Sequence, residues 1–356
     1  MSITITDNRA AARGRTRPRS VPAAWMFLAK RLGFYLVTAA FAVTLNFAIP
    51  RFMPGDPVST MIKQITQETG APPSASAIAQ LRAIYGDPTK NLIGQYATYL
   101  DHLAHFDLGI SSTQYPTPVS HLILVALPWT LSLVTVTTVL AWIIGTLLGA
   151  WLGSHPGGRA DSWLTSGTTF INAIPTFWLG MLFLGLFSFM LHWFPSAGGY
   201  DPNVPYDINN VWFWLSTLRY GALPAFTLVF IGFSGWLFSM RNVMVTTVSE
   251  DYVQLARAKG LPRRTVLFRY AARNALLPNV TGLAHAIGYV IGGVVLVETT
   301  FTYPGMGYLL EQAVTTHDFP VMQAIFIMIT LAVLVSNFIA DSLYVLLDPR
   351  TREEDA

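Results

Sequence analysis

Hydrophobic residues gather into six long runs, which polar and charged stretches separate. The runs cover 32–49, 122–153, 168–190, 222–238, 281–297 and 321–347. Each run is mostly uncharged and has about 17 or more residues, which is the length that an α-helix needs to cross the hydrocarbon core of a bilayer. The pattern therefore predicts an all-α integral membrane protein with six transmembrane helices.

The second run is longer than one straight crossing requires, since an α-helix rises 1.5 Å per residue. Pro128 lies near its start, and Gly145, Gly149 and Gly153 recur every four residues near its end. Proline bends membrane helices, and small residues at this spacing allow two helices to approach closely. We therefore expect a bent or tilted helix that packs tightly against a neighbour.

The runs divide the chain into five expected parts. They are a basic N-terminal tail, a first transmembrane helix, an extracytoplasmic loop, a five-helix core and a C-terminal tail, at 1–31, 32–49, 50–121, 122–347 and 348–356. No Ala-x-Ala site follows the first run, so we expect a retained helix rather than a cleaved signal peptide. Within the loop, apolar residues at helical spacing between 78 and 104 predict small amphipathic helices.

Charge sets the expected orientation. Only 12% of the residues are charged and 52% are hydrophobic, whereas roughly a quarter are charged in soluble proteins. If both termini are cytoplasmic, 17 of the 22 Lys and Arg residues lie on the inner side. That bias is the one that the positive-inside rule favours. The chain has no cysteine, which excludes disulfides and cysteine-ligated metal sites.

The inner loop 241–278 carries signals that start and stop helices. Ser249 is a favoured N-cap, and acidic residues at 250 and 251 complement the positive end of a helix dipole. Gly260 supplies a left-handed residue that ends a helix, and Pro262 suits the first turn of a second one. These signals predict a helix–turn–helix outside the membrane.

Small residues next to this turn suggest a surface for a partner protein. Ala256 and Ala258 would form a low-profile knob that a groove in another protein could accept. The loop's basic residues are equally typical of a simple positively charged anchor. The pattern alone therefore does not demonstrate a partner.

The same loop resembles a known family. Residues 253–261 and 273–278 are similar to the cytoplasmic coupling loop of ABC importer permeases, in particular the B-type permease of the dipeptide/oligopeptide/nickel family. The general pattern begins Glu-Ala-Ala, whereas this chain has Gln-Leu-Ala at 254–256, a departure that the peptide branch tolerates. The residues expected to couple to an ATPase are Glu250, Asp251, Gln254, Ala256, Arg257, Ala258, Lys259, Gly260, Leu261, Asn274 and Pro278.

Four further motifs extend the resemblance over almost the whole chain after residue 25. They lie at 54–57, at 107–111 with 118–119, at 303–307 with 318 and 320, and at 347–350. The second departs from the family pattern, because Phe106 stands where glycine is usual. The outer residues expected to matter are Pro54, Gly55, Asp56, Pro57, Gly109, Ser111, Pro304, Gly305, Gly307 and Asp318.

The resemblance implies a type I ABC importer permease in a bacterial or archaeal plasma membrane. The helix before Gly260 would sit in a cleft of an ATPase subunit. It implies a second, C-type permease, two P-loop ATPase subunits and an extracytoplasmic substrate-binding protein, with no nucleic acid. This chain has no Gly-x-x-x-x-Gly-Lys-Ser/Thr stretch, so we expect no enzyme activity and no cofactor here, and Mg-ATP in the partner subunits.

Oligopeptides are the expected cargo, oligosaccharides are the alternative, and nickel is less favoured. The segment 211–215 contains two tryptophans and is typical of an interfacial aromatic belt, although such rings also stack on sugars. A long loop over 198–221 resembles forms linked to oligosaccharide uptake. His102 and His105 are three residues apart and could share a metal ion, but surface histidines at helical spacing are common.

Acidic residues within the runs bear on the class of transporter. Glu298 and Asp341 both lie near an expected membrane face, where boundary placement or an interhelical hydrogen bond explains them. An ion-coupled transporter would need acidic residues near the midplane, and none lies there. An ATP-independent channel or secondary transporter is therefore the weaker alternative.

Overall fold

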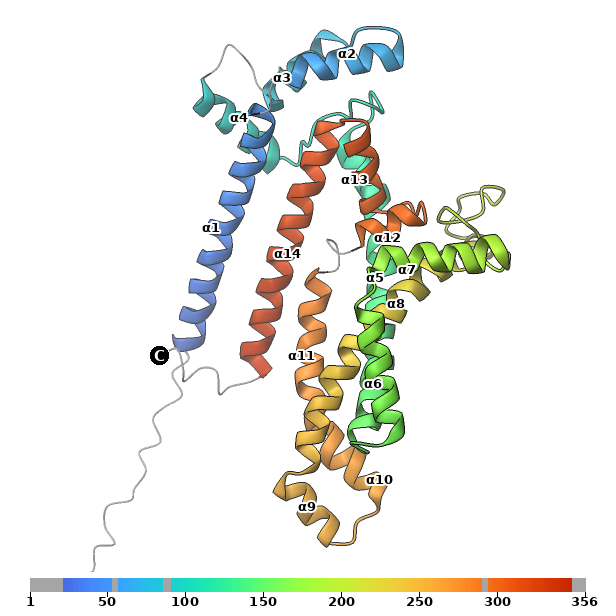
Figure 1. The fold of residues 1–356 in the computed structure, drawn as a ribbon. Helices are drawn as coiled ribbons and strands as arrows, with labels where there is room; N and C mark the ends of the chain where they lie inside the picture. The colour runs from blue at the N-terminus through green and yellow to red at the C-terminus, as the bar shows by residue number, and fades with distance from the viewer. Residues whose placement is uncertain (1–21, 53–56, 86–90, 290–293, 348–356) are drawn as a thin grey trace, which may run out of the picture.

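The computed structural model describes residues 22–52, 57–85, 91–289 and 294–347, and helices make up most of them. Figure 1 shows long helices side by side, with short helices above and below them. Within the described ranges, extended pairing is limited to one isolated bridge, between Ile110 and Pro118. The all-α prediction is therefore confirmed.

The first half of the chain places long helices on either side of a group of short ones. The helices here are α1 (Pro22–Phe52), α2 (Pro57–Thr69), α3 (Ala75–Tyr85), α4 (Leu92–Ala104), α5 (Val119–Gly153), α6 (Arg159–Asn172), α7 (Thr176–Phe183) and the π-helix η1 (Leu184–Met190).

The second half alternates long and short helices. They are α8 (Val211–Val248), α9 (Asp251–Ala258), α10 (Arg263–Thr265), the π-helix η2 (Val266–Ala272), α11 (Arg273–Tyr289), α12 (Val295–Thr300), α13 (Met306–Thr315) and α14 (Phe319–Leu347).

Four of the described helices are long and apolar enough to cross a membrane. They are α1, α5, α8 and α14, and a fifth crossing is added if the bent pair of α6 with α7 and η1 counts as one. The predicted run 281–297 is divided between α11, the undescribed residues 290–293 and α12. A multi-pass helical protein is therefore established, while the count of six crossings stays a prediction.

The third predicted run does not form one straight helix. α6 ends at Asn172, α7 begins at Thr176, and the two segments are bent by 99°. Pro175 lies at the break with φ −59° and ψ 134°. Proline lacks an N–H and disfavours helical geometry in the residue before it. The prediction of a continuous helix over 168–190 is therefore wrong, and Pro175 was the signal against it.

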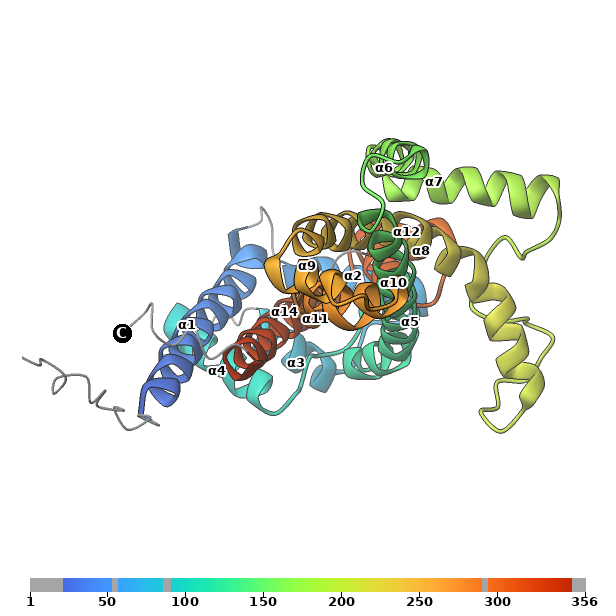
Figure 2. The same ribbon diagram turned by 90° about the horizontal axis from the view of Figure 1, so that it is seen from below.

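The fourth run continues in both directions within α8. Asn210 caps the helix, because its side-chain oxygen accepts a hydrogen bond from the N–H of Trp212 at 3.0 Å. A loop over 198–221 was expected, but the connection ends at this cap, so that prediction is wrong. In both ribbon views α7 and the beginning of α8 extend away from the other long helices (Figures 1 and 2).

The helices α5 and α8 pack with their backbones in direct contact. A Cβ atom added at Gly145 would lie 2.3 Å from the carbonyl oxygen of Phe233, and one at Gly149 would lie 2.5 Å from that of Leu237. Neither position has room for a side chain, and Gly153 is equally close to Met244. The predicted close contact through small residues is confirmed.

Short helices cover one end of α1 and α14. Met61 of α2, Leu81 of α3 and Tyr99 of α4 form one buried cluster with Phe47 and Ile327. The predicted amphipathic helices between 78 and 104 are therefore present. Ile93, one of the apolar residues at helical spacing in this segment, is instead 79% exposed.

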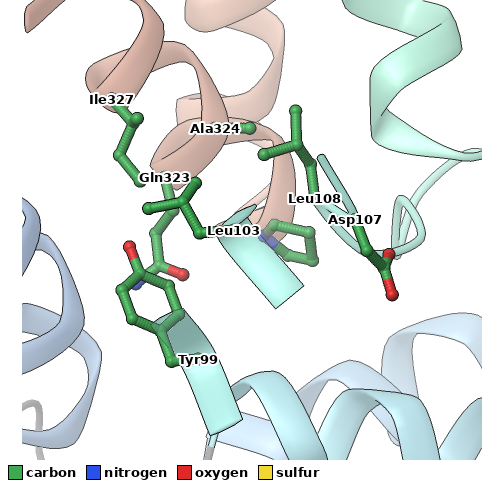
Figure 3. Close-up of a pocket in the computed structure, with 8 residues that line it drawn as sticks. Tyr99, Leu103, Asp107, Leu108, Gln323, Ala324 and Ile327 are labelled. Atoms are coloured by element: carbon green, nitrogen blue, oxygen red, sulfur yellow. The ribbon is translucent and has the colours of Figure 1, made fainter. Parts of the chain in front are cut away.

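Buried hydrogen bonds join α1 to α4 and α14 next to these short helices. The side-chain amide of Asn46 donates to the hydroxyl of Tyr99 at 3.2 Å, and the amide of Gln323 donates to the Asn46 carbonyl at 2.8 Å. Figure 3 shows Tyr99 and Gln323 beside a cavity of about 20 Å³ that Asp107 also lines. A cavity of this size holds about one water molecule, so it suits a structural water and not a solute.

Candidate functional site

The short helix α9 begins one residue later than its sequence signals indicated. Glu250 is the N-cap, with φ −65° and ψ 146°, and Asp251 lies in the first turn. Ser249 has helical geometry at the end of α8, and its hydroxyl donates to the carbonyl of Thr246 at 2.6 Å. The expected Ser249 cap is therefore wrong, because the preceding helix continues to Val248 and uses this residue for its own end.

The end of α9 follows the sequence prediction closely. Gly260 has φ +73°, its N–H donates to the carbonyl of Arg257 at 2.9 Å, and the N–H of Leu261 donates to that of Ala256 at 3.4 Å. These two bonds form a Schellman motif, in which the residue after the C-cap adopts the left-handed conformation. The predicted left-handed stop at Gly260 is confirmed.

One face of α9 is fixed inside the protein. Val253 is fully buried and Ala256 is 3% exposed, and both belong to a cluster with Met240 and Met244 of α8. Ala256 therefore cannot form an outward knob together with Ala258, which is exposed. The knob prediction is wrong because residues two apart on a helix do not share a face.

The opposite face of α9 is open. Its exposed residues include a large apolar side chain, Leu255, which is 56% exposed. The polar or small residues Gln254, Arg257 and Ala258 and the C-cap Lys259 are also exposed. A helix periodicity of 3.6 with positions 253 and 256 buried places 255 outward. Leu255 was not among the expected coupling residues, because helical spacing alone does not say which face of α9 the rest of the chain covers.

The second expected element of the loop holds α9 in place. The amide of Asn274, at the start of α11, donates to the hydroxyl of Tyr252 at 2.9 Å. Val266 and Ala271 of η2 are buried in the same cluster as the inner face of α9. Pro262 immediately precedes α10, so the predicted second helix is present.

Pro278 lies within α11 and is followed by a buried asparagine that the motif did not include. Asn279 is 1% exposed, accepts from the hydroxyl of Ser239 at 2.6 Å and donates to that of Thr146 at 3.1 Å. It therefore joins α11 to α8 and α5. Packed residues and hydrogen bonds thus connect α9 to α8 and α11, and Asn279 of α11 connects them to α5.

A bidentate ion pair connects α6 to α8 near the same end. The guanidinium of Arg241 donates to both carboxylate oxygens of Asp161, at 2.6 and 2.7 Å. Asp161 is 3% exposed and also accepts from the N–H of Gly157 at 2.9 Å. The two partners are 80 residues apart, so the sequence offered no signal of this pairing.

At the other end of the molecule, the motif residue Asp318 holds the turn over 109–118 against α14. Its Oδ2 accepts from the hydroxyl of Ser111 at 2.5 Å and from the N–H and hydroxyl of Thr113 at 3.1 and 2.8 Å. Its backbone carbonyl accepts from Met322 in the first turn of α14. Gly109 lies in the same turn with φ +84° and accepts from the N–H of Val119. Two motifs about 200 residues apart therefore meet at one carboxylate.

Glu298 forms a second buried cluster with the glycines of the 303–307 motif. It is fully buried, and it accepts from the hydroxyl of Thr130 at 2.7 Å and from the N–H of Gly307 at 2.6 Å. A Cβ atom at Gly305 would lie 2.4 Å from its carboxylate, so only glycine fits there. The interpretation of Glu298 as an interhelical hydrogen-bonding residue is confirmed.

Some of the remaining motif residues pack within the protein, and the others lie outside the described residues. Pro304 packs against Gly199, where an added Cβ would lie 2.7 Å from its ring. Pro57 begins α2, whereas Pro54, Gly55 and Asp56 lie outside the described residues. The Asp341 side chain also lies outside them. The structure thus brings Gly109, Ser111 and Asp318 to one cluster, and Gly305 and Gly307 to another.

Comparison with known proteins identifies the family. Residues 145–353 match the model described as "binding-protein-dependent transport system inner membrane component". The chain belongs to this family.

Two relatives match almost the whole of this inner membrane component. The oligopeptide transport system permease protein AppB of Bacillus subtilis (strain 168) is 35% identical over 311 residues, which cover 86% of this chain and 92% of AppB. The di/tripeptide transport system permease protein DppB of Pseudomonas aeruginosa (strain UCBPP-PA14) is 33% identical over 342 residues, which cover 92% of this chain and 99% of DppB. The resemblance to ABC importer permeases is therefore confirmed.

Membership of the family settles the class of the protein. The chain is a permease subunit of an ABC importer, and the alternatives of an ATP-independent channel or a secondary transporter are set aside. The permease has no catalytic role of its own, since the ATPase belongs to separate subunits in this family. The helix α9 is accordingly its candidate site of contact with the energy-supplying part of the transporter.

The two histidines on the outer helix of the permease each have a separate partner. His102 Nδ1 lies 2.8 Å from the Oδ2 of Asp107, and His105 Nδ1 lies 2.8 Å from the carbonyl oxygen of Asp101. Among the residues that the structure describes, no group of three His, Cys, Asp or Glu side chains could hold a metal ion. These contacts favour local helix-end hydrogen bonds for the pair.

Proposed function

We propose that this permease is the B-type subunit of an importer that moves oligopeptides into the cytoplasm, with α9 docked in an ATPase subunit. The observation that carries the proposal is the division of α9 into a buried face and an exposed face that includes Leu255. Relatives named for oligopeptide and di/tripeptide transport support this cargo. They favour peptides over oligosaccharides and nickel.

The proposed arrangement has six membrane crossings and both termini in the cytoplasm. The basic residues of 241–278 then face the cytoplasm, and α2, α3 and α4 face outward. A C-type permease would complete the translocation path, and an extracytoplasmic binding protein would deliver the peptide. Two P-loop ATPase subunits would bind Mg-ATP, since this chain has no phosphate-binding loop of that type.

The contacts of α9 indicate how ATPase closure would act on the permease. Burying the exposed Leu255 in a cleft of the ATPase would contribute about 1.5–3 kcal/mol at most to the free energy of docking. A contact of this size favours docking and still allows the two subunits to separate. The buried face of α9 is packed on Met240 and Met244. A displacement of α9 would therefore be transmitted to α8 and, through Asn279, to α11 and α5.

Uptake and co-purification test the proposal together. A strain that lacks this chain should fail to accumulate a labelled tripeptide, and the wild-type chain should restore uptake. The tagged chain, extracted gently from its membrane, should bring with it a second permease and P-loop ATPase subunits. Leu255→Asp should lose the ATPase subunits and keep the second permease, because a charge in an apolar cleft is costly.

A matched control separates docking from general damage. Ile93 is another exposed apolar residue, 79% exposed, but it lies on α4 at the opposite end. Ile93→Asp should leave ATPase recovery unchanged. If the wild-type chain purifies alone even after mild crosslinking, or if Leu255→Asp retains the ATPase subunits, docking through α9 is contradicted.

A further inference from the structure

A large hollow lies on the arm formed by η1, the connection 191–210 and the first turns of α8. It is a wide depression, open to its surroundings, with a volume of about 850 Å³, and small-molecule sites measure roughly 300–1,000 Å³. In Figure 1 this arm projects from the side of the long helices, beyond α7. None of the motifs that identified the family falls on the residues that line it.

Two opposite charges line this hollow without pairing to each other. Arg219 is the only Lys or Arg between positions 160 and 240, and within the described residues it forms no ion pair. Asp201 is held by α8, because its N–H donates to the hydroxyl of Ser216 at 2.6 Å. Its Oδ1 accepts from the N–H and the amide of Asn203, at 2.9 and 3.0 Å. Its Oδ2 accepts no hydrogen bond from the described part of the chain.

The lining of the hollow is partly aromatic and partly polar. Phe189 and Trp212 line it and are 62% and 70% exposed. Ser188 and Ser216 also line it, so hydroxyl groups lie beside the aromatic rings. This combination suits a ligand that has both apolar and polar groups.

We propose that this hollow binds a short peptide by its free ends, with Arg219 on the terminal carboxylate and Asp201 on the terminal ammonium. A guanidinium binds a carboxylate through two charge-assisted hydrogen bonds, and a free carboxylate oxygen accepts from an ammonium group. Aromatic side chains suit the apolar side chains of a peptide. A neutral oligosaccharide would leave both charges unpaired, and a divalent cation would be repelled by Arg219. The inference rests on the proposed peptide import and adds a binding site within the permease.

The absence of cysteine from the chain makes a direct test possible. Ser196 lines the hollow and is exposed, so Ser196→Cys gives a single thiol there. Ile208→Cys is the matched control, because Ile208 is 64% exposed on the same connection but does not line the hollow. The assembled importer in membrane vesicles is treated with a maleimide, and labelling is measured on this chain alone. Trialanine should slow labelling of Ser196→Cys at least about fivefold and leave Ile208→Cys unchanged.

Capped peptides and a charge variant identify which ends are bound. N-acetyl-trialanine amide should give no protection, because it has neither terminal charge. Adding Arg219→Gln to Ser196→Cys should raise the trialanine concentration needed for protection about tenfold, in line with the loss of a charge-assisted hydrogen bond. Arg219→Lys should restore part of the protection.

The outcomes separate this inference from the proposed function. If the intact importer takes up trialanine but the peptide protects neither thiol, or protects both equally, the hollow is not a peptide site and peptide import stands. Protection by the capped peptide, or failure of Ser196→Cys to react at all, also overturns the assignment of the hollow. If the importer takes up no peptide, the proposed cargo itself is wrong.

Discussion

Two regions of the permease use their charged residues in opposite ways. In the region around α12 and α13, Glu298 and Asp318 are 0% and 1% exposed, and their carboxylates are hydrogen-bonded within the chain. At the end of α9, Arg257 and its C-cap Lys259 are exposed and form no side-chain hydrogen bond with the described residues. The first pair of residues therefore builds the fold, whereas the second pair belongs to a surface. Substitutions in the two regions should fail in different ways.

The largest expected effect is loss of the folded permease on Gly305→Ala. The added methyl group would lie 2.4 Å from the Glu298 carboxylate, which is fully buried and cannot move into water. Displacing it leaves a buried charge short of partners, at a cost of about 3 kcal/mol or more. The apparent melting temperature of the extracted complex should fall by at least about 4 °C.

Gly167→Ala is the control for this change. An added Cβ at Gly167 meets nothing within 4 Å, so its stability should match the wild type. Equal melting temperatures for Gly305→Ala and the wild type would contradict the role given to the Glu298 cluster.

The next effect is loss of uptake without loss of the protein, on Gly260→Val. An added Cβ there has open space, so the change acts only through the backbone, which has φ +73°. A β-branched residue is unfavourable in that conformation by about 1–2 kcal/mol, which is enough to disturb the end of α9 but not the core. Uptake should fall more than tenfold, with unchanged membrane content and a melting temperature that falls by a few degrees at most.

Gly70→Val is a closely matched control for Gly260→Val. Gly70 also has φ +73° and open space around an added Cβ, but it follows α2 at the outer end. The same backbone strain should therefore leave uptake nearly intact. Equal loss of uptake in both variants would show that the turn at Gly260 has no special relation to docking.

Sequence reasoning succeeded where local rules decide the structure. The apolar runs at 32–49, 122–153, 222–238 and 321–347 each lie in one long helix, and the glycine spacing in α5 and the left-handed stop at Gly260 were also predicted correctly. These features depend on local hydropathy, on spacing and on the conformational freedom of a single residue. It was wrong for Ser249 and for the loop 198–221, where two elements compete for the same residues. In both cases helix α8 extends further than its apolar run, so its ends were misplaced.

Contacts between distant segments were the part that the sequence could not supply. Asp161 meets Arg241, and Glu298 meets Thr130, across separations of 80 and 168 residues. The orientation of Ala256 likewise depends on which face of α9 the rest of the chain covers. The motif resemblance indicated which residues matter, but their division between fold and surface required the three-dimensional arrangement.

A smaller effect on stability is expected for Ser111→Ala. The hydroxyl of Ser111 donates to Asp318 at 2.5 Å and accepts from the N–H of Gln114 at 2.9 Å. Thr113 still provides two bonds to the same carboxylate, so the loss should be about 1–2 kcal/mol. The melting temperature should fall by a few degrees, and uptake per folded molecule should stay unchanged. A fall in uptake with no fall in stability would mean that the Asp318 cluster takes part in transport itself. The contrast between a buried region that builds the fold and an exposed region that forms a surface would then be wrong.

The smallest expected effect is that of Arg257→Gln on ATPase docking. Arg257 is exposed on α9 and has no partner among the described residues, so its charge is available to an acidic group on the ATPase. An exposed ion pair contributes about 0–1 kcal/mol, which corresponds to a change of a few-fold at most in the affinity of the ATPase for the extracted permease. Salt screens exposed charges, so the difference from the wild type should disappear at high ionic strength.

Arg82→Gln, at the end of α3, is the charge-matched control and should have no effect at any salt concentration. A loss of affinity that persists at high salt would mean that Arg257 is buried on docking, and the inner surface would then depend on a desolvated charge as well as on the apolar contact of Leu255.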